Sequence, residues 1–103
     1  MKVKWTPFAM EEMLKIAKYI CENFGKVAKD KFLSEVYYVA KMLGRDPDAG
    51  KREPILEHRA KTYRSFVVNK LNKIVYFVDN NHIEIADFWA ARQSPDTLAN
   101  RVK

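Results

Sequence analysis

The chain has 103 residues, of which 48% are hydrophobic and 31% charged, and its formal net charge is +6. This composition excludes a disordered chain, and the length supports one modest hydrophobic core. No apolar run approaches the roughly 20 residues of a membrane span, and the first residues lack the apolar stretch of a secretory signal. We therefore expect a single cytoplasmic domain over residues 1–103, without a membrane segment.

The first half of the chain predicts a short strand followed by two helices. Residues 2–5 alternate in polarity as an edge strand does, and Thr6 and Pro7 are suited to an N-cap and a first-turn proline. Apolar residues then recur at three- and four-residue spacing over residues 10–24 and again over residues 28–43. We expect an antiparallel helix hairpin with a glycine between the two helices.

The second half predicts three consecutive antiparallel strands, at residues 63–69, 73–79 and 82–89. They are rich in β-branched and aromatic residues and are joined by short asparagine-containing turns. A two-residue turn at residues 80–81 would place Val78 opposite Ile83, and would place Tyr76 opposite Ile85.

Alternation along these strands assigns their side chains to two faces of the sheet. We expect the helix hairpin to cover an apolar face that includes Ile74, Tyr76 and Trp89. The opposite face is expected to stay open, with Arg64 and Lys73 close together. The other residues assigned to the open face are Phe66, Val75, Phe77, Glu84 and Phe88.

The segments on either side of the strands are less regular. Residues 53–57 predict a further short strand or an extended arm, which Pro54 keeps out of the centre of the sheet. Residues 98–102 predict a short C-terminal helix that requires packing, expected along the open face. The fold class is therefore α+β: an N-terminal strand and an antiparallel helix hairpin on a twisted antiparallel sheet, with a short C-terminal helix.

Positive charge is concentrated between residues 51 and 73, which contain seven Lys or Arg and two Glu. Such a patch suits nucleic acid, an acidic protein or simply solvent, and charge alone does not choose among them. Cys21 is the only cysteine, and His58 and His82 have no second ligand at metal spacing. We expect no metal and no other cofactor.

The order of a strand, a helix hairpin, a basic three-stranded meander and an arginine after the last strand resembles the RelE/ParE superfamily of type II toxin–antitoxin toxins. The residues that carry this resemblance are Trp5, the pattern over residues 16–25, Leu43 with Pro47 and Gly50, Tyr63 with Arg64, and residues 73–76, 83–85 and 92–95.

This resemblance implies a growth-inhibiting toxin that is neutralised by a cognate antitoxin. Members of the superfamily either cut messenger RNA on the ribosome or poison DNA gyrase. The long helix hairpin and the ending at residues 98–102 look more like the ParE branch. The main expectation is therefore a gyrase poison, and the alternative is a ribosome-dependent endoribonuclease.

In the ribonuclease alternative, the resemblance implies that Arg64, Lys73 and Arg92 contact and stabilise the reacting phosphate. Glu53 would be the base, as in YoeB-like ribonucleases, and Tyr63 follows it at the expected spacing. This sequence departs from the ribonuclease pattern at four positions. Phe66 replaces a further lysine, Leu98 replaces a stacking tyrosine, and Ala90 and Ala91 replace a His-Tyr pair.

An antitoxin is expected to neutralise the protein by laying a helix or an extended segment over the open basic face. Apolar side chains on that face would otherwise contact water, which indicates a partner surface. The residues assigned to partner binding are Phe66, Phe77, Phe88, Leu98 and Arg101.

Overall fold

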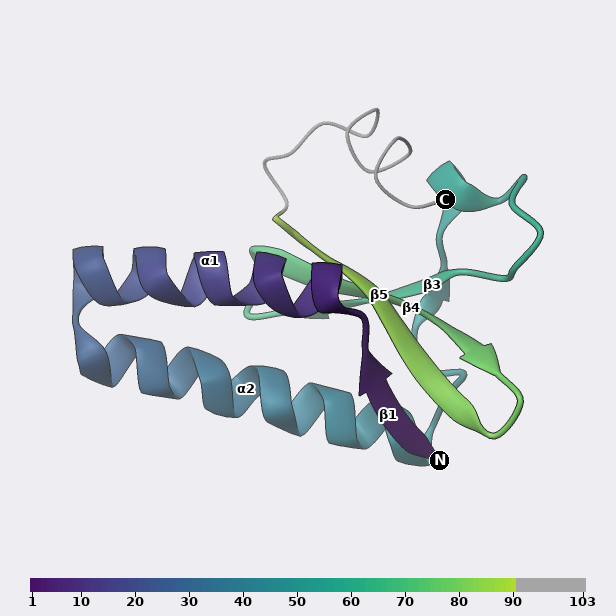
Figure 1. The fold of residues 1–103 in the computed structure, drawn as a ribbon, viewed down its shortest axis with the longest axis horizontal. Coiled ribbons are helices and arrows are strands. Elements are labelled where there is room, and N and C mark those ends of the chain that lie inside the picture. The colour runs from purple at the N-terminus through teal and green to yellow at the C-terminus, as the bar shows by residue number, and fades with distance from the viewer. Residues whose placement is uncertain (91–103) are drawn as a thin grey trace.

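The computed structural model describes residues 1–90 and shows two helices packed on one side of a five-stranded sheet (Figure 1). The predicted C-terminal helix lies outside these described residues, as do Arg92, Leu98 and Arg101. In chain order, the elements are β1 (Lys2–Trp5), α1 (Pro7–Phe24), α2 (Lys26–Arg45), β2 (Lys51–Arg52), the short 3₁₀ helix η1 (Pro54–Leu56), β3 (Arg64–Val68), β4 (Asn72–Asp79) and β5 (His82–Ala90).

The sheet has the strand order β1-β5-β4-β3-β2. Strand β1 pairs with β5 in parallel, whereas all other neighbours are antiparallel, so the sheet is mixed. The predicted α+β class and the antiparallel meander are confirmed. The turn between β4 and β5 contains two residues, and Asn80 has a φ of 55° there. Val78 pairs with Ile83 and Tyr76 with Ile85, as predicted.

The two helices form the predicted antiparallel hairpin (Figure 1). The hydroxyl of Thr6 accepts a hydrogen bond from the backbone N–H of Ala9 at 3.1 Å, and Pro7 occupies the first turn. Gly25 alone separates the helices and has a φ of 93°, a conformation that glycine adopts without strain. None of the helices within residues 1–90 is long and apolar enough to cross a membrane.

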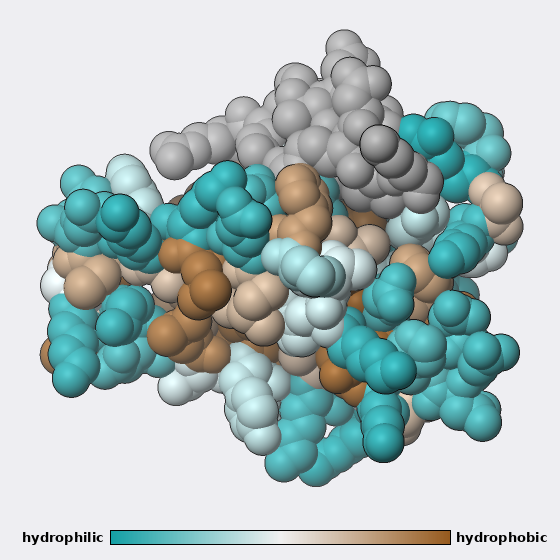
Figure 2. Space-filling view, viewed as in Figure 1, coloured by the Kyte–Doolittle hydropathy of each residue, from teal (hydrophilic) through white to brown (hydrophobic). Residues whose placement is uncertain are grey.

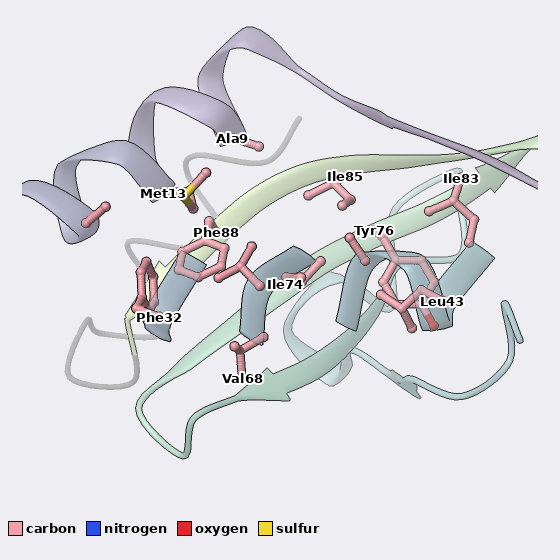
Figure 3. Packing of buried hydrophobic residues seen from close by; sticks show 13 residues of the cluster. Ala9, Met13, Phe32, Leu43, Val68, Ile74, Tyr76, Ile83, Ile85 and Phe88 are labelled. Carbon is pink, nitrogen blue, oxygen red and sulfur yellow. The ribbon is translucent and has the colours of Figure 1, made fainter. Parts of the chain in front are cut away.

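The main hydrophobic core lies between the helix hairpin and the sheet (Figure 3). Phe88 of β5 stands at its centre, with its ring 6.3 Å from that of Trp5 and 5.9 Å from that of Phe32. The same core takes Met13 from α1 and Ile74 from β4. On the outer side of the hairpin, apolar side chains gather over the two helices (Figure 2). Exposed large apolar side chains of the two helices include Leu14, Tyr19, Phe24 and Val27.

A β-bulge in β5 reverses two predicted positions. Val75 pairs with Asp87 while Tyr76 pairs with Ile85, so Ala86 has no partner in β4. Beyond the bulge, Phe88 points into the core under the helices, and Trp89 points to the other face. The prediction that Phe88 lines the open face and Trp89 the helix-covered face was wrong, because it assumed unbroken alternation.

The turn between β3 and β4 reverses a second set of positions. Val68 pairs with Asn72, so the loop contains three residues, and Asn69 has a positive φ of 47°. Arg64 consequently pairs with Tyr76, whereas Lys73 pairs with Val67. Because a shift of one residue moves every side chain to the other face, Arg64 and Lys73 do not lie together, and that prediction was wrong.

Phe66 is also on the face opposite to its predicted one. It pairs with Ile74 and packs against the core under the helices. Phe77 does lie on the face away from the helices, as predicted, but only 4% of it is exposed. Phe66 and Phe88 therefore contribute to the fold on the helix side and form no open aromatic surface with Phe77.

The helix-free face is covered in part by the segment between β2 and β3, which we call the arm (residues 53–63). The arm and the sheet enclose a second hydrophobic cluster. Lys61 lies over the ring of Phe77, with Nζ 4.1 Å from the ring centroid. The prediction of a strand or an extended arm at residues 53–57 was wrong, because Pro54–Leu56 form η1 and the short strand β2 lies just before them. The arm covers much of the face that was expected to be open. The buried members of this cluster are Leu56, Tyr63, Val75, Phe77 and Trp89.

Candidate functional site

Two of the predicted site residues meet on the helix-free face. Lys73 Nζ donates a hydrogen bond to Glu53 Oε2 at 2.7 Å and lies 4.4 Å from the ring centroid of Trp89. Only 4% of Glu53 is exposed. A buried carboxylate requires such a cationic partner, since burial without one is costly. Glu53 therefore acts as the counter-ion of Lys73 in this arrangement.

The arm fixes Glu53 through its backbone. The N–H of Glu53 donates to the carbonyl of Tyr63 at 2.9 Å, and its carbonyl accepts from the N–H of Leu56 at 3.1 Å. Pro54 follows and begins η1, where its fixed φ suits the first position. The ten-residue spacing between Glu53 and Tyr63 therefore closes the arm at its base.

Arg64 has a different role, on the other side of the sheet. One guanidinium nitrogen donates to the carbonyl of Gly50 at 2.9 Å, and the other lies 3.6 Å from the carboxylate of Asp48. Asp48 is mostly exposed, so this ion pair contributes little. The main action of Arg64 within residues 1–90 is to hold the loop that connects α2 to β2.

Tyr76 holds the same loop through its side-chain hydroxyl. From the sequence, Tyr76 was predicted only as a residue of the helix-covered face. Its hydroxyl donates to the carbonyl of Pro47 at 2.8 Å and accepts from the N–H of Gly50 at 2.9 Å. A Cβ at Gly50 would lie 2.5 Å from this hydroxyl, so only glycine fits there. Burial raises the pKa of the Tyr76 hydroxyl above its ordinary value of 10.0, although the hydrogen bond from Gly50 and the charge of Arg64 oppose the shift.

Replacing Tyr76 by phenylalanine is expected to lower the free energy of unfolding by about 1–3 kcal/mol, because the buried N–H of Gly50 and the partly buried carbonyl of Pro47 lose their partner. The folded protein also holds the tyrosine proton more tightly than the unfolded chain. Stability is therefore expected to fall as the pH rises above 10.0. Urea unfolding between pH 8 and 11 checks both effects, and the Tyr76→Phe variant should show the shallower alkaline decline. If the unfolding free energies of the wild type and the variant declined equally with rising pH, this role for Tyr76 would be contradicted.

A small cavity of about 160 Å³ lies beside the arm, and basic side chains of the arm and of β2 line it. Arg52, Arg59 and Lys61 line it, and Glu53 and Glu57 contribute carboxylates. The concentration of charge between residues 51 and 73 was the signal for this group, but the sequence did not place its members around one cavity. The arrangement is suited to holding an anion.

The predicted ribonuclease set is therefore not brought together within residues 1–90. Lys73 and Glu53 pair on the helix-free face, while Arg64 holds a loop on the other side of the sheet. Arg92 lies outside the described residues.

Solved structures with this fold include toxins of toxin–antitoxin systems. A chain described as the chromosomal ParDE TA system from P. aeruginosa superimposes with a TM-score of 0.73 at 17% identity, covering 89% of this chain and 97% of that chain. The YoeB dimer from Staphylococcus aureus has a TM-score of 0.57 at 27% identity, covering 86% and 94%. The YoeB-YefM complex from Staphylococcus aureus has a TM-score of 0.54 at 25% identity, with the same coverage.

The helix hairpin on a mixed sheet, with β1 parallel to β5, together with the match of the sequence to a ParE toxin family, defines a toxin domain of the RelE/ParE superfamily, as the resemblance implied. Residues 3–95 match the sequence model of the family described as ParE toxin of type II toxin-antitoxin system, parDE. The chain belongs to this ParE toxin family. No curated protein matches the sequence.

Proposed function

We propose that this toxin stops growth by acting on DNA gyrase in the cytoplasm, as ParE-like proteins do, without cutting RNA. The observation that carries this proposal is the separation of Arg64 from Lys73. Arg64 of β3 pairs with Tyr76 in β4, whereas Lys73 lies in β4 and pairs with Trp89 in β5, so the two side chains lie on opposite faces of the sheet. Membership of the ParE toxin family points in the same direction.

The separation matters because of the chemistry of RNA cleavage. Attack by a 2′-hydroxyl needs a base for its proton, an acid for the leaving oxygen and positive charge focused on one phosphate. A phosphate held by Lys73 has the sheet between it and Arg64. Glu53 is already paired with Lys73 at 2.7 Å, which removes the most plausible base. Binding without hydrolysis suits this surface better.

A ribosome-dependent endoribonuclease is the second candidate. It is favoured by the similarity to YoeB of Staphylococcus aureus at 27% identity and by the cations Arg52, Arg59 and Lys61 around one cavity. In this alternative, Arg92 would supply the positive charge that Arg64 does not bring to the helix-free face.

Pulse-labelling of DNA and protein synthesis in the minutes after induction in a bacterium separates the two candidates. We expect DNA synthesis to fall first while translation continues, and we expect the purified toxin to stabilise cleaved DNA in a gyrase reaction. Immediate arrest of translation, with cut messenger RNA on purified ribosomes, would contradict the gyrase proposal. An Arg92→Ala control that still inhibits DNA synthesis would remove Arg92 from the mechanism.

The antitoxin partner follows from the toxin class, and we propose that part of it covers the helix-free face. Glu53 already neutralises Lys73, so further positive charge on that face comes from Lys61 of the arm, whose Nζ lies over the ring of Phe77. Leu98 and Arg101 remain proposed partner contacts.

A further inference from the structure

The end of the helix hairpin, where α1 meets α2, projects beyond the sheet (Figure 1). We call residues 19–29 the tip. Only Gly25 separates the two helices. Its N–H donates to the carbonyl of Cys21 at 2.9 Å and closes α1, while its carbonyl accepts from the N–H of Lys29 at 3.2 Å and opens α2. The tip is therefore a helical protrusion with a fixed one-residue turn.

Large apolar side chains are exposed together on this tip. Val27 is 85% exposed, Phe24 69% and Tyr19 46%. The rings of Tyr19 and Phe24 meet edge to face, with their centroids 6.5 Å apart. Within residues 1–90, none of the three belongs to either hydrophobic cluster. An exposed apolar group of this kind adds little to the stability of the domain and indicates a contact surface.

The charged residues of the tip are placed against the stability of both helices. The first turn of α2 contains Lys26 and Lys29 and no acidic residue, and the last turn of α1 contains Glu22 and no basic residue. Because of its dipole, a helix favours acidic groups at its N-terminus and basic groups at its C-terminus. Val27 adds a β-branched residue of modest helix propensity at an exposed position. Stability of the fold does not account for these residues.

The charge around the apolar group selects the occupant. Within residues 18–31, four lysines stand against Glu22 and Asp30, which gives a net charge of +2. A second copy of this chain, joined tip to tip, would bring the lysines together. The backbone of a nucleic acid offers no apolar pocket for Phe24 and Val27. A protein pocket with an apolar wall and carboxylates at its rim complements both the side chains and the charge.

We propose that the tip is the surface through which the toxin contacts its target, and that Phe24 and Val27 enter an apolar pocket with an acidic rim on that protein. The inference rests on the proposed function, in which the target is DNA gyrase. Phe24 is the aromatic anchor, and Lys26 and Lys29 meet the rim. The one-residue turn presents these side chains in a fixed arrangement, so little conformational entropy is lost on binding. This surface is distinct from the helix-free face.

The test measures binding of the purified full-length toxin to immobilised gyrase holoenzyme. We expect Phe24→Ser to weaken binding by about tenfold or more, the usual effect of removing an aromatic anchor. The matched control is Tyr37→Ser, because Tyr37 is also 69% exposed but lies on α2 away from the tip, and it should bind as the wild type does. Both variants should keep the urea midpoint of the wild type, since both side chains are exposed. Undiminished binding by Phe24→Ser would overturn the proposal.

A charge reversal at the tip separates binding from stability. Lys26→Glu places an acidic residue in the first turn of α2, so it should raise the urea midpoint while it weakens gyrase binding by about fivefold or more. A residue that served only the fold would not move the two measurements in opposite directions. Lys41→Glu, at an exposed position near the other end of α2, makes the same change in net charge and should leave binding unchanged. Equal weakening by both variants would contradict the acidic rim.

Growth assays keep this inference separate from the proposed function. If the wild type binds gyrase and Phe24→Ser binds equally well, only the role of the tip is wrong. If the wild type does not bind gyrase but stops growth, and Phe24→Ser loses this effect while Tyr37→Ser retains it, the tip contacts another target and only the gyrase proposal is wrong. A wild type that neither binds gyrase nor stops growth would overturn both.

Discussion

Replacing Phe88 by alanine is expected to lower the free energy of unfolding by about 3–5 kcal/mol. The side chain is 1% exposed and packs between Trp5 and Phe32, so its removal leaves a cavity that aromatic rings on two elements cannot readily fill. A domain of this size has a total stability of about 5–15 kcal/mol. Urea unfolding followed by tryptophan fluorescence measures the loss.

The matched control is Leu14→Ala, which truncates a half-exposed side chain on α1. A substitution at such a position is expected to change the unfolding free energy by no more than about 0.5 kcal/mol. If Phe88→Ala were no more costly than this control, the bulge at Ala86 would be wrong and Phe88 would face solvent.

Replacing Lys73 by methionine is expected to cost about 3–5 kcal/mol, the usual effect of leaving a buried charge without its partner. The carboxylate of Glu53 would stay under the arm with no cation in place of Nζ. Methionine keeps most of the aliphatic stem, so packing against Trp89 changes little. Thermal and urea unfolding at neutral pH measure the effect.

The double variant with Glu53→Gln tests the cause of that loss. Removing both charges should recover much of the stability, because neither buried group then lacks a counter-ion. Additive losses in the two single variants and the double variant would show that the ion pair does not hold the arm. A toxicity assay on the double variant would also report whether Lys73 acts beyond the fold.

The helices and the last hairpin were predictable because their signals are local. Thr6 and Pro7 mark the start of α1, and the apolar spacing that follows has one period throughout. The turn at Asn80 was predictable because two adjacent asparagine residues specify both its length and its positive φ. The order of elements then carried the resemblance to the superfamily.

The faces of β3 and β5 were not predictable, because each depends on one residue that breaks a simple pattern. Asn69 begins a turn of three residues, whereas the predicted faces require a connection of four residues at 69–72, and Ala86 is an ordinary strand residue that happens to be bulged. Either change inverts every side chain that follows it. The candidate site shared this error, since it relied on Arg64 and Lys73 facing the same way.

The contact between Glu53 and Lys73 joins residues that are 20 positions apart, across an arm with no regular period. No local pattern indicates such a pair. What the sequence did provide was the local excess of positive charge, which gathers around the arm and its cavity.

The unpaired Ala86 also has a consequence for comparing relatives of this toxin. A relative that lacks this residue would keep the same faces, because removing an unpaired residue leaves the pairing of Phe88 with Ile74 and of Trp89 with Lys73 unchanged. A relative that keeps the residue but pairs it regularly would instead exchange the layers in which the residues matching Phe88 and Trp89 are buried. Roles beyond Ile85 therefore follow strand register and not the number of residues along the strand.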